Sequence, residues 1–416
     1  MQRLLQFFIL CFLPGLLSAG GAFVYEITTA EMRLGTAGWS SRANDPSTVF
    51  TNPAGMTRLN SPQLQAGAGA LFSHLVFDPN DNTQTRGSKG HGNLWLPIGS
   101  SFLVYPYSEC IRFGFASLGY FGSSLKYNHK WVGRYYVQKT LLQGLSLVPA
   151  VAYKLNDFWS FGFGLNVMYG FFRQRSAINN RLDGLEDGWV NLHDYRWGVG
   201  YLAGVLYEPC NTTRFGIQYL SHVRLHLRAV PKFRKLGPQL EALFEEVGII
   251  GSQIDLDVKV PESVMFSAYH QLNCGFAVMA DIGWQRWQNF QKTIFAPVDN
   301  ASITFTPKYK NSWHFAVGAE WYWSPSWTLS GGVAYDTSCV KPRNRTFNYP
   351  VGKQWRFGTG ARFTYSENLL FDIATELLWQ GKMFADQSRG PLGGRVSGHY
   401  HNNYVWFLAS DIIWKF

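Results

Sequence analysis

Two small groups of polar side chains come nearest to a catalytic arrangement. His193 is followed by Asp194, and His399 and His401 are separated by one residue. Neither group is accompanied by Gly-x-Ser-x-Gly, His-Glu-x-x-His, a Walker A loop or an EF-hand loop, and no two cysteines form a Cys-x-x-Cys pair. The sequence therefore predicts no enzyme, no catalytic residue, no metal site and no cofactor.

Three cations could support a different kind of chemistry. Arg356, Arg362 and Lys154 fall on the polar phase of segments whose alternate residues are apolar. Such a cation can hold an anionic ligand. It can also form an ion pair with an acidic residue on the polar phase of another segment, and the candidates are Asp281, Glu320, Asp372 and Glu376. We favour the ion pairs.

The segments that carry these side chains alternate with a period of two. In residues 158–171 large apolar side chains alternate with small or polar ones, as in Trp159-Ser160-Phe161. This pattern predicts a β-strand whose two faces meet different solvents. Aromatic residues stand at both ends of the apolar face, as the interfacial girdles of a membrane barrel require. The core face of a soluble sandwich would be mostly aliphatic.

The composition also favours a barrel over a soluble sandwich. Aromatic residues make up 17% of the chain, glycines number 42, and charged residues are only 15%, against about a quarter in soluble proteins. Past the N-terminus no apolar run approaches the roughly 20 residues of a spanning helix. The net charge of +10 is scattered, which excludes nucleic acid as a partner. Basic groups near the barrel ends could instead meet anionic lipid or an anionic substrate.

The segments bounded by turns predict an all-β fold, a transmembrane antiparallel β-barrel of about 14 strands. The strands are expected near residues 62–78, 92–106, 111–126, 139–154, 158–174, 191–207, 214–229, 253–272, 275–289, 302–322, 326–338, 353–366, 369–382 and 397–416. The last strand ends in Phe416, the kind of aromatic terminus common in bacterial outer-membrane barrels. Short turns alternate with long loops, which places the short turns and both chain ends on the periplasmic side.

The chain is expected to have three parts. Residues 1–20 read from Arg3 through an apolar run to small residues, which predicts a cleaved signal peptide. Residues 61–416 form the barrel, whose lumen is too wide for its own side chains to fill. We therefore expect residues 21–60 to be a hatch that plugs the lumen, with a disordered periplasmic tail as the alternative. Asn52, Pro53, Ala54 and Gly55 are predicted to be a rigid turn of this hatch with a role in gating.

Two long loops, Ser176–Trp189 and Pro231–Ile250, are expected outside the cell. In the second, Leu240, Leu243 and Phe244 recur at helical spacing, which predicts an amphipathic helix over residues 238–247. Its apolar face either packs on neighbouring loops or offers a groove for an apolar substrate. The cysteines past the signal segment could form disulfides or be tolerated thiols, and both readings stay open: Cys110, Cys210, Cys274 and Cys339.

Several stretches resemble the FadL-type outer-membrane transporters of long-chain fatty acids and other hydrophobic compounds. The matching residues are 35–38 (Gly-Thr-Ala-Gly), 45–56 with Asn52-Pro53-Ala54, 147–157, 260–264 and 327–336. The resemblance implies a 14-stranded barrel closed by an N-terminal hatch, with capture by external loops and a lateral opening at a kinked strand. The kink would fall in the third strand, where Gly119 and Gly122 are the candidates.

The leading hypothesis is passive uptake of hydrophobic molecules, above all long-chain fatty acids, through the plugged barrel. A fatty acid needs an apolar slot and a cation for its carboxylate, so Arg356, Arg362, Lys154, Leu240, Leu243 and Phe244 are the candidate substrate-binding residues. The alternatives are a general diffusion porin and a structural or adhesin barrel. The expected partners are the hydrophobic molecule and outer-membrane lipid around a monomer, in a Gram-negative outer membrane.

Overall fold

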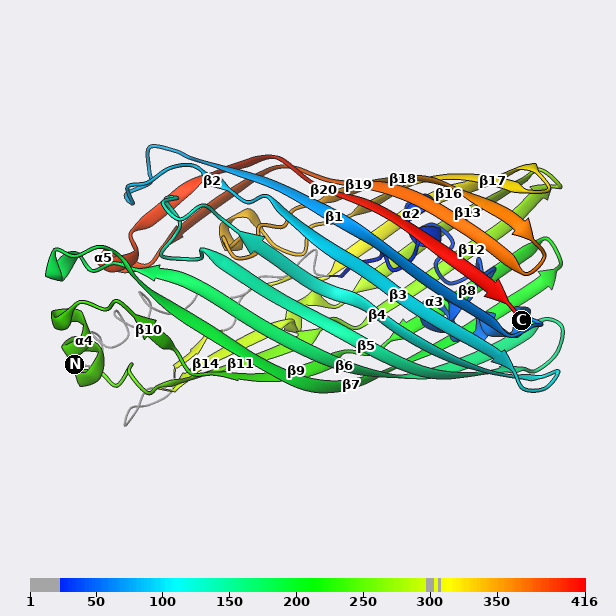
Figure 1. Ribbon diagram of the computed structural model, residues 1–416, viewed down its shortest axis with the longest axis horizontal. Coiled ribbons are helices and arrows are strands. Elements are labelled where there is room, and N and C mark those ends of the chain that lie inside the picture. The colour runs from blue at the N-terminus through cyan, green and yellow to red at the C-terminus, as the bar shows by residue number, and fades with distance from the viewer. Residues whose placement is uncertain (1–22, 297–302, 306–307) are drawn as a thin grey trace.

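Fourteen antiparallel crossings close into a barrel in the computed structural model (Figure 1), as the sequence predicted. The structure describes residues 23–296, 303–305 and 308–416, so the predicted signal peptide lies outside the described residues. Ten crossings are single strands: β1 (Gln63–Pro79), β3 (Leu94–Pro106), β4 (Ile111–Lys126), β5 (Lys139–Lys154), β6 (Trp159–Ile178), β7 (Gly188–Cys210), β17 (Trp327–Asp336), β18 (Gln354–Ser366), β19 (Leu369–Ser388) and β20 (Arg395–Lys415). Pairing of β1 with β20 closes the sheet.

The other four crossings are each divided into two strands. They are β8 (Thr213–Leu220) with β9 (Val223–Ala229), β11 (Gln253–Val260) with β12 (Ser263–Asn273), β13 (Phe276–Gln285) with β14 (Gln291–Ala296), and β15 (Ile303–Phe305) with β16 (Ser312–Ser324). The sequence predicted one unbroken strand for three of them, and the strand that it predicted at 275–289 ended before β14. Pro261 explains one interruption because it has no N–H to donate to a ladder. Beyond these breaks, β9, β11, β14 and β15 form a separate four-stranded sheet.

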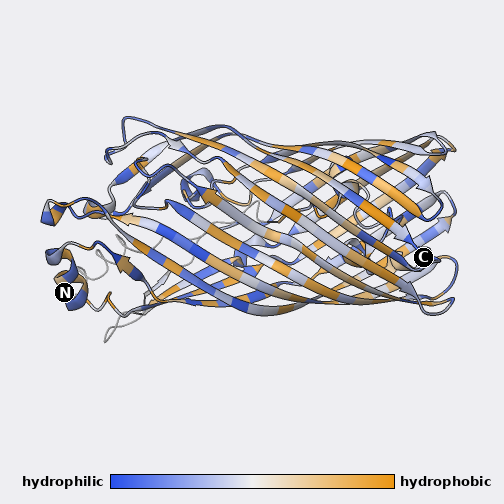
Figure 2. Ribbon diagram, in the orientation of Figure 1, coloured by the Kyte–Doolittle hydropathy of each residue, from blue (hydrophilic) through white to orange (hydrophobic). Residues whose placement is uncertain are grey.

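Apolar segments, orange in Figure 2, recur along the strands of the wall, and large apolar side chains are exposed on its outward face. On β6, Trp159, Phe163 and Leu165 are exposed, whereas their neighbours Ser160 and Asn166 are buried toward the lumen. The alternation predicted from the sequence is therefore the division between a lipid-facing and a lumen-facing surface.

Long loops and short helices lie at the end of the barrel opposite the C-terminus (Figure 1). They include β2 (Gly90–His91), β10 (Lys232–Arg234), α4 (Pro238–Glu246), α5 (Gly390–Gly393) and the 3-10 turns η2 (Arg181–Asp183) and η4 (Pro342–Asn344), whereas the 3-10 turn η3 (Trp287–Asn289) lies at the break between β13 and β14. The predicted loop helix is confirmed as α4. No helix among the described residues is long and apolar enough to cross a membrane.

The N-terminal segment lies inside the barrel as α2 (Thr29–Arg33), α3 (Thr48–Thr51) and η1 (Pro53–Arg58). Almost every residue from 23 to 59 is buried, so the hatch prediction is right and the disordered tail is wrong. The hatch backbone approaches the wall where the wall has glycines. A Cβ on Gly332 of β17 would overlap the carbonyl of Leu34, and one on Gly162 of β6 would overlap the backbone nitrogen of Ala54.

Candidate functional site

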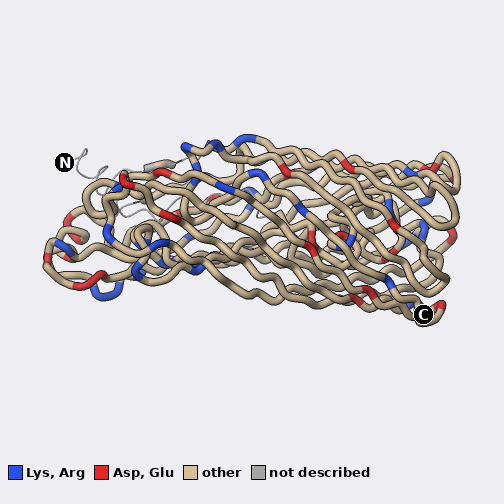
Figure 3. The backbone as a smooth tube through the Cα atoms, turned by 90° about the horizontal axis from the view of Figure 1, so that it is seen from above, with Lys and Arg blue, Asp and Glu red and all other residues tan. Residues whose placement is uncertain are grey.

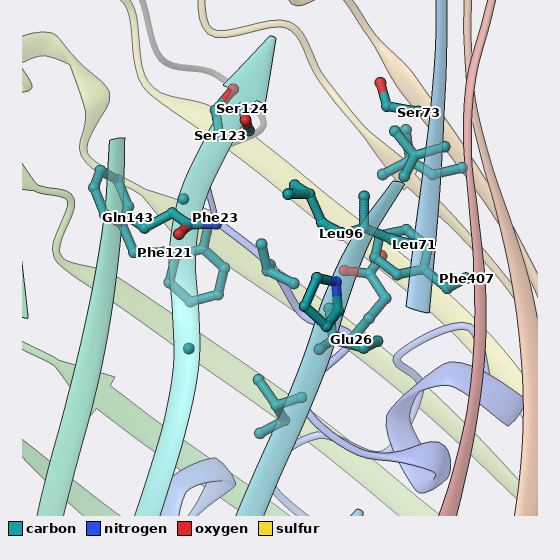
Figure 4. Close-up of a pocket in the computed structure, with 18 of the residues that line it drawn as sticks. Phe23, Glu26, Leu71, Ser73, Leu96, Phe121, Ser123, Ser124, Gln143 and Phe407 are labelled. Carbon is teal, nitrogen blue, oxygen red and sulfur yellow. The ribbon is translucent and has the colours of Figure 1, made fainter. Parts of the chain in front are cut away.

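A cavity of about 370 Å³ lies between the start of the hatch and the inner face of the wall (Figure 4). Its apolar lining includes Leu71 of β1, Leu96 of β3, Phe121 of β4 and Phe407 of β20. Polar groups also reach it, from Ser73, Ser123, Ser124, Gln143 and Gln380. An enclosed and mostly apolar space with a few polar groups is suited to a hydrophobic small molecule.

The wall beside this cavity is incomplete between β3 and β4. The two strands pair from Pro106 and Arg112 only as far as Ser100 and Leu118. Beyond that point β5 is the only strand that pairs with β4 among the described residues, with a register shift between Leu118 and Phe121. The predicted kink candidates lie in this part of β4, and Gly119 and Gly122 both line the cavity.

The first described residues of the hatch occupy this gap. The Val24 amide donates a hydrogen bond of 2.7 Å to the carbonyl of Tyr120, and Phe23 forms an antiparallel bridge with Phe121. In Figure 4 Phe23 lies next to Phe121 and Gln143 at the β4 side of the cavity, opposite Leu71 and Phe407. The hatch therefore supplies β4 with hydrogen bonding that β3 does not provide.

Arg356, predicted to face the lumen, lines the cavity but is surrounded by carboxylates. It forms ion pairs with Glu26 of the hatch, with Asp336 at 3.0 Å and with Glu376 at 3.4 Å. Its remaining amino group donates to Gln354 at 3.3 Å. Three acidic side chains therefore surround the guanidinium, so Arg356 is committed to ion pairs and is not free to hold a bound carboxylate.

Arg362 and two hatch arginines form further buried ion pairs. Arg362 contacts Asp372 at 2.7 Å and Asp45 of the hatch at 3.1 Å, and Arg33 of the hatch contacts Glu320 at 3.1 Å. Arg42 holds Asp45 within the hatch at 2.5 Å. Removing one partner of a buried ion pair typically costs about 3–5 kcal/mol, so these contacts tie the hatch firmly to the wall.

The predicted turn at Asn52 joins the hatch to the wall through its side chain. Its amide group donates to the carbonyls of Ser40 at 2.7 Å and Val205 of β7 at 3.0 Å. Its side-chain oxygen accepts from the amide of Ala54 at 3.1 Å and so caps η1, with Pro53 at the first position. Gly55 is packed against Thr48 and Ala43 of the hatch.

The remaining predicted substrate residues lie away from the cavity. Lys154, at the end of β5, is half exposed and pairs with Asp157 in the adjoining short turn at 2.8 Å, and it is not part of the cavity lining. Leu240 and Phe244 are buried under α4, where Phe244 packs on Phe233 of β10. The cavity lining contains neither these residues nor Leu243, which supports the packing interpretation of this helix.

The cysteines and possible metal ligands do not form a site in the described part of the chain. Cys110, Cys210 and Cys274 are exposed free thiols, and Cys339 is buried. No group of three or more His, Cys, Asp or Glu side chains could hold a metal ion there.

The sequence did not identify the hatch residues that shape the site. Phe23 and Glu26 reach the cavity, yet neither belongs to a motif. The sequence held one signal for them, which was the set of charged residues expected inside the lumen: Arg356, Glu320, Asp372 and Glu376. Buried charges need partners of opposite sign. Charges on the plug were the natural partners for them.

Comparison with known proteins gives one consistent result. The profile of a family described as "Outer membrane protein transport protein (OMPP1/FadL/TodX)" matches residues 11–416. The "Long-chain fatty acid transport protein" of Escherichia coli (strain K12) is 22% identical over 405 residues, covering 86% of this chain and 88% of that protein. The "47 kDa outer membrane protein" of Pasteurella multocida (strain Pm70) is 26% identical over 393 residues, covering 87% and 88%.

Two solved structures share the fold. A Pseudomonas aeruginosa FadL homologue has a TM-score of 0.83 at 19% identity and covers 97% of this chain and 100% of that one. The P. putida toluene transporter TodX has a TM-score of 0.70 at 12% identity and covers 95% and 99%.

Proposed function

The chain belongs to the OMPP1/FadL/TodX family of outer membrane transport proteins, and we propose that its substrates are long-chain fatty acids. Transport of hydrophobic compounds across the bacterial outer membrane is the activity of this family, whose members are channels and not enzymes. The finer choice of a fatty acid is supported by the curated relatives named long-chain fatty acid transport proteins. The carrying observation is an apolar cavity that faces the gap between β3 and β4 under a closed hatch.

The proposed route has three stages. A hydrophobic molecule enters from the external loops, occupies the cavity bounded by Leu71, Leu96 and Phe407, and leaves sideways past Phe121 when the hatch terminus withdraws. Lateral exit suits such a molecule because it passes from apolar protein to apolar membrane without crossing the polar hatch.

The acid is expected to enter in its neutral, protonated form. Arg356 is committed to three carboxylates, and the other charged groups in the lining are Glu26 and Asp411. A carboxylate would therefore find no uncommitted cation in the lining, whereas a protonated acid can hydrogen-bond to Gln143, Ser123 or Ser124. The same observation makes an uncharged hydrocarbon the second candidate substrate.

Uptake of radiolabelled oleate tests the proposal in cells that lack their own fatty acid transporter. Cells producing this chain should take up oleate faster than cells with an empty vector, and oleyl alcohol should compete as well as oleate. Equal uptake with and without the chain would refute the fatty acid assignment. If the chain raises uptake of radiolabelled hexadecane but not of oleate, the hydrocarbon is favoured. A large steady single-channel conductance would instead indicate an open porin.

A further inference from the structure

A row of basic side chains crosses the outer surface of β5, β6, β7 and β10. Lys139 of β5 stands directly opposite Arg175 of β6, which stands opposite Asn191 of β7, which in turn stands opposite Lys232 of β10. Arg173 lies two residues before Arg175 and Arg234 lies two residues after Lys232. Directly opposite positions and positions two apart share one face of a sheet, so these cations lie on one surface. We call this set the basic row.

The basic row faces outward, toward the membrane. Gln174 and Ser176 alternate with it on β6 and are buried in the lumen. The outward face of β6 runs from Trp159 to Phe171 before it reaches Arg173. The basic row therefore continues the lipid-facing surface of the strand.

The row lies at the depth of the outer-leaflet headgroups. Twelve residues separate Trp159 from Phe171. At about 3.4 Å per residue and a tilt of about 40°, they span about 30 Å, which is the hydrocarbon thickness of a bilayer. Tyr169, Phe171, Tyr195 and Trp197 form the aromatic girdle at this point, with ring centroids of Tyr169 and Trp197 4.8 Å apart. Arg173 and the rest of the basic row lie just beyond it.

The positive charges of the row are not compensated by protein carboxylates. Lys139, Arg173, Arg175, Lys232 and Arg234 form no ion pair among the described residues. The nearby Asp187 is occupied by Arg134 at 2.7 Å and by the Tyr135 hydroxyl at 2.8 Å. Asp194 is occupied by Arg196 at 3.2 Å and by the amide of Arg228 at 2.6 Å.

Arg175 is the least satisfied member of the row. Its Nε is buried without a hydrogen-bond partner among the described residues, and its guanidinium lies 4.6 Å from the centre of the Trp189 ring. Lys139 and Arg175 are directly opposite each other, and like charges in such positions destabilise a sheet. An anion bound between them would relieve this repulsion and supply charge-assisted hydrogen bonds. Figure 3 shows many Lys and Arg residues at this end of the barrel.

We propose that the basic row binds the phosphate groups of lipid A, the phosphorylated glycolipid of the outer leaflet. Lipid A is present in the outer leaflet of the membrane that holds this barrel. The aromatic girdle places its phosphate groups at the same depth as the basic row. The phosphates are negative and the uncompensated side chains of the row are positive. The bound lipid would hold β5, β6 and β7 beside the external loops. This inference is independent of which molecule the cavity takes.

Binding of fluorescent lipid A to the purified full-length barrel in detergent tests the proposal. The test variant combines Arg173→Gln, Arg175→Gln and Lys232→Gln. The matched control combines Lys130→Gln, Lys341→Gln and Arg343→Gln, which removes the same charge from exposed residues of other external loops. We expect the test variant to lose at least tenfold in affinity and the control to stay within twofold of wild type. We also expect wild-type binding to weaken as salt rises.

Dephosphorylated lipid A provides a second measurement that needs no variant. Wild-type protein should bind it at least tenfold more weakly than intact lipid A. The proposal is overturned if the test variant, shown to be folded by its heat-dependent gel mobility, binds intact lipid A like wild type. It is equally overturned if wild type binds both lipids alike, and this arm holds even if the test variant does not fold.

Discussion

Replacing Gly332 with alanine should loosen the hatch without damaging the barrel. Gly332 lies on the inward face of β17, against the hatch backbone at Leu34 and Gly35. A Cβ there would overlap the Leu34 carbonyl and come within 3.0 Å of the Gly35 nitrogen. A Cβ on Gly35 would in turn lie 2.7 Å from the Gly332 carbonyl carbon, so neither side can make room.

The size of the effect follows from the overlap. Overpacking a well-packed contact costs about 1–3 kcal/mol. The barrel strands keep their ladder, so the strain is relieved by moving the hatch. A shift of that size in the balance between docked and undocked hatch raises the undocked population by about 5- to 150-fold.

Gly331→Ala is the matched control, because Gly331 is the next residue on the same strand. The nearest atom to a Cβ at Gly331 is 3.9 Å away, which leaves open space. In planar bilayers we expect Gly332→Ala to show frequent opening events, and Gly331→Ala to be as quiet as wild type. Both proteins should show the heat-dependent gel mobility of a folded barrel. A folded Gly332→Ala protein as silent as its control would refute the idea that backbone docking at this glycine keeps the hatch closed.

Three further perturbations address the cavity, the ion pairs and the thiols. Leu71→Trp should fill part of the 370 Å³ cavity and slow oleate uptake severalfold, whereas Ala70→Trp on the other face of β1 should not; equal uptake would place the route elsewhere. Arg356→Met leaves Glu26 and Glu376 without their cation, which should destabilise the closed barrel by about 3–5 kcal/mol, and an unchanged unfolding temperature on heated gels would contradict this. Burial raises the pKa of the Cys339 thiol to about 12, so at neutral pH maleimide should label it only after denaturation. Mass spectrometry should find the exposed thiols labelled in the native protein, namely those of Cys110, Cys210 and Cys274.

The strands of the wall could be predicted from the sequence because the residue pattern of each strand depends on the solvent at its two faces. A strand between lipid and a polar lumen must alternate residue by residue, so its bounds are local information. β4 and β5 begin and end at the predicted residues. The pair between Arg362 and Asp372 was also accessible, since the two residues are direct neighbours on adjoining strands.

The hatch contacts could not be predicted in the same way. Glu26 and Arg356 form an ion pair across more than three hundred residues of sequence, and no local pattern fixes which wall cation a plug carboxylate will meet. The wall glycines were similarly ambiguous. On the polar phase of a strand a glycine is merely small, and only the position of the hatch shows that Gly332 and Gly162 admit a second backbone.

The hydrogen bonding at the gap implies that the wall and the hatch open together. Beyond Leu118 the edge of β4 is no longer paired with β3, and an unpaired strand edge facing lipid costs several kcal/mol for each unsatisfied group. Val24 satisfies the Tyr120 carbonyl, and Phe23 pairs with Phe121 beside it. If the hatch terminus withdrew alone, these groups would be exposed to the membrane. We therefore expect withdrawal to occur only when a hydrophobic molecule occupies the cavity, or when β4 moves to regain partners, so that the closed state is stable while the cavity is empty.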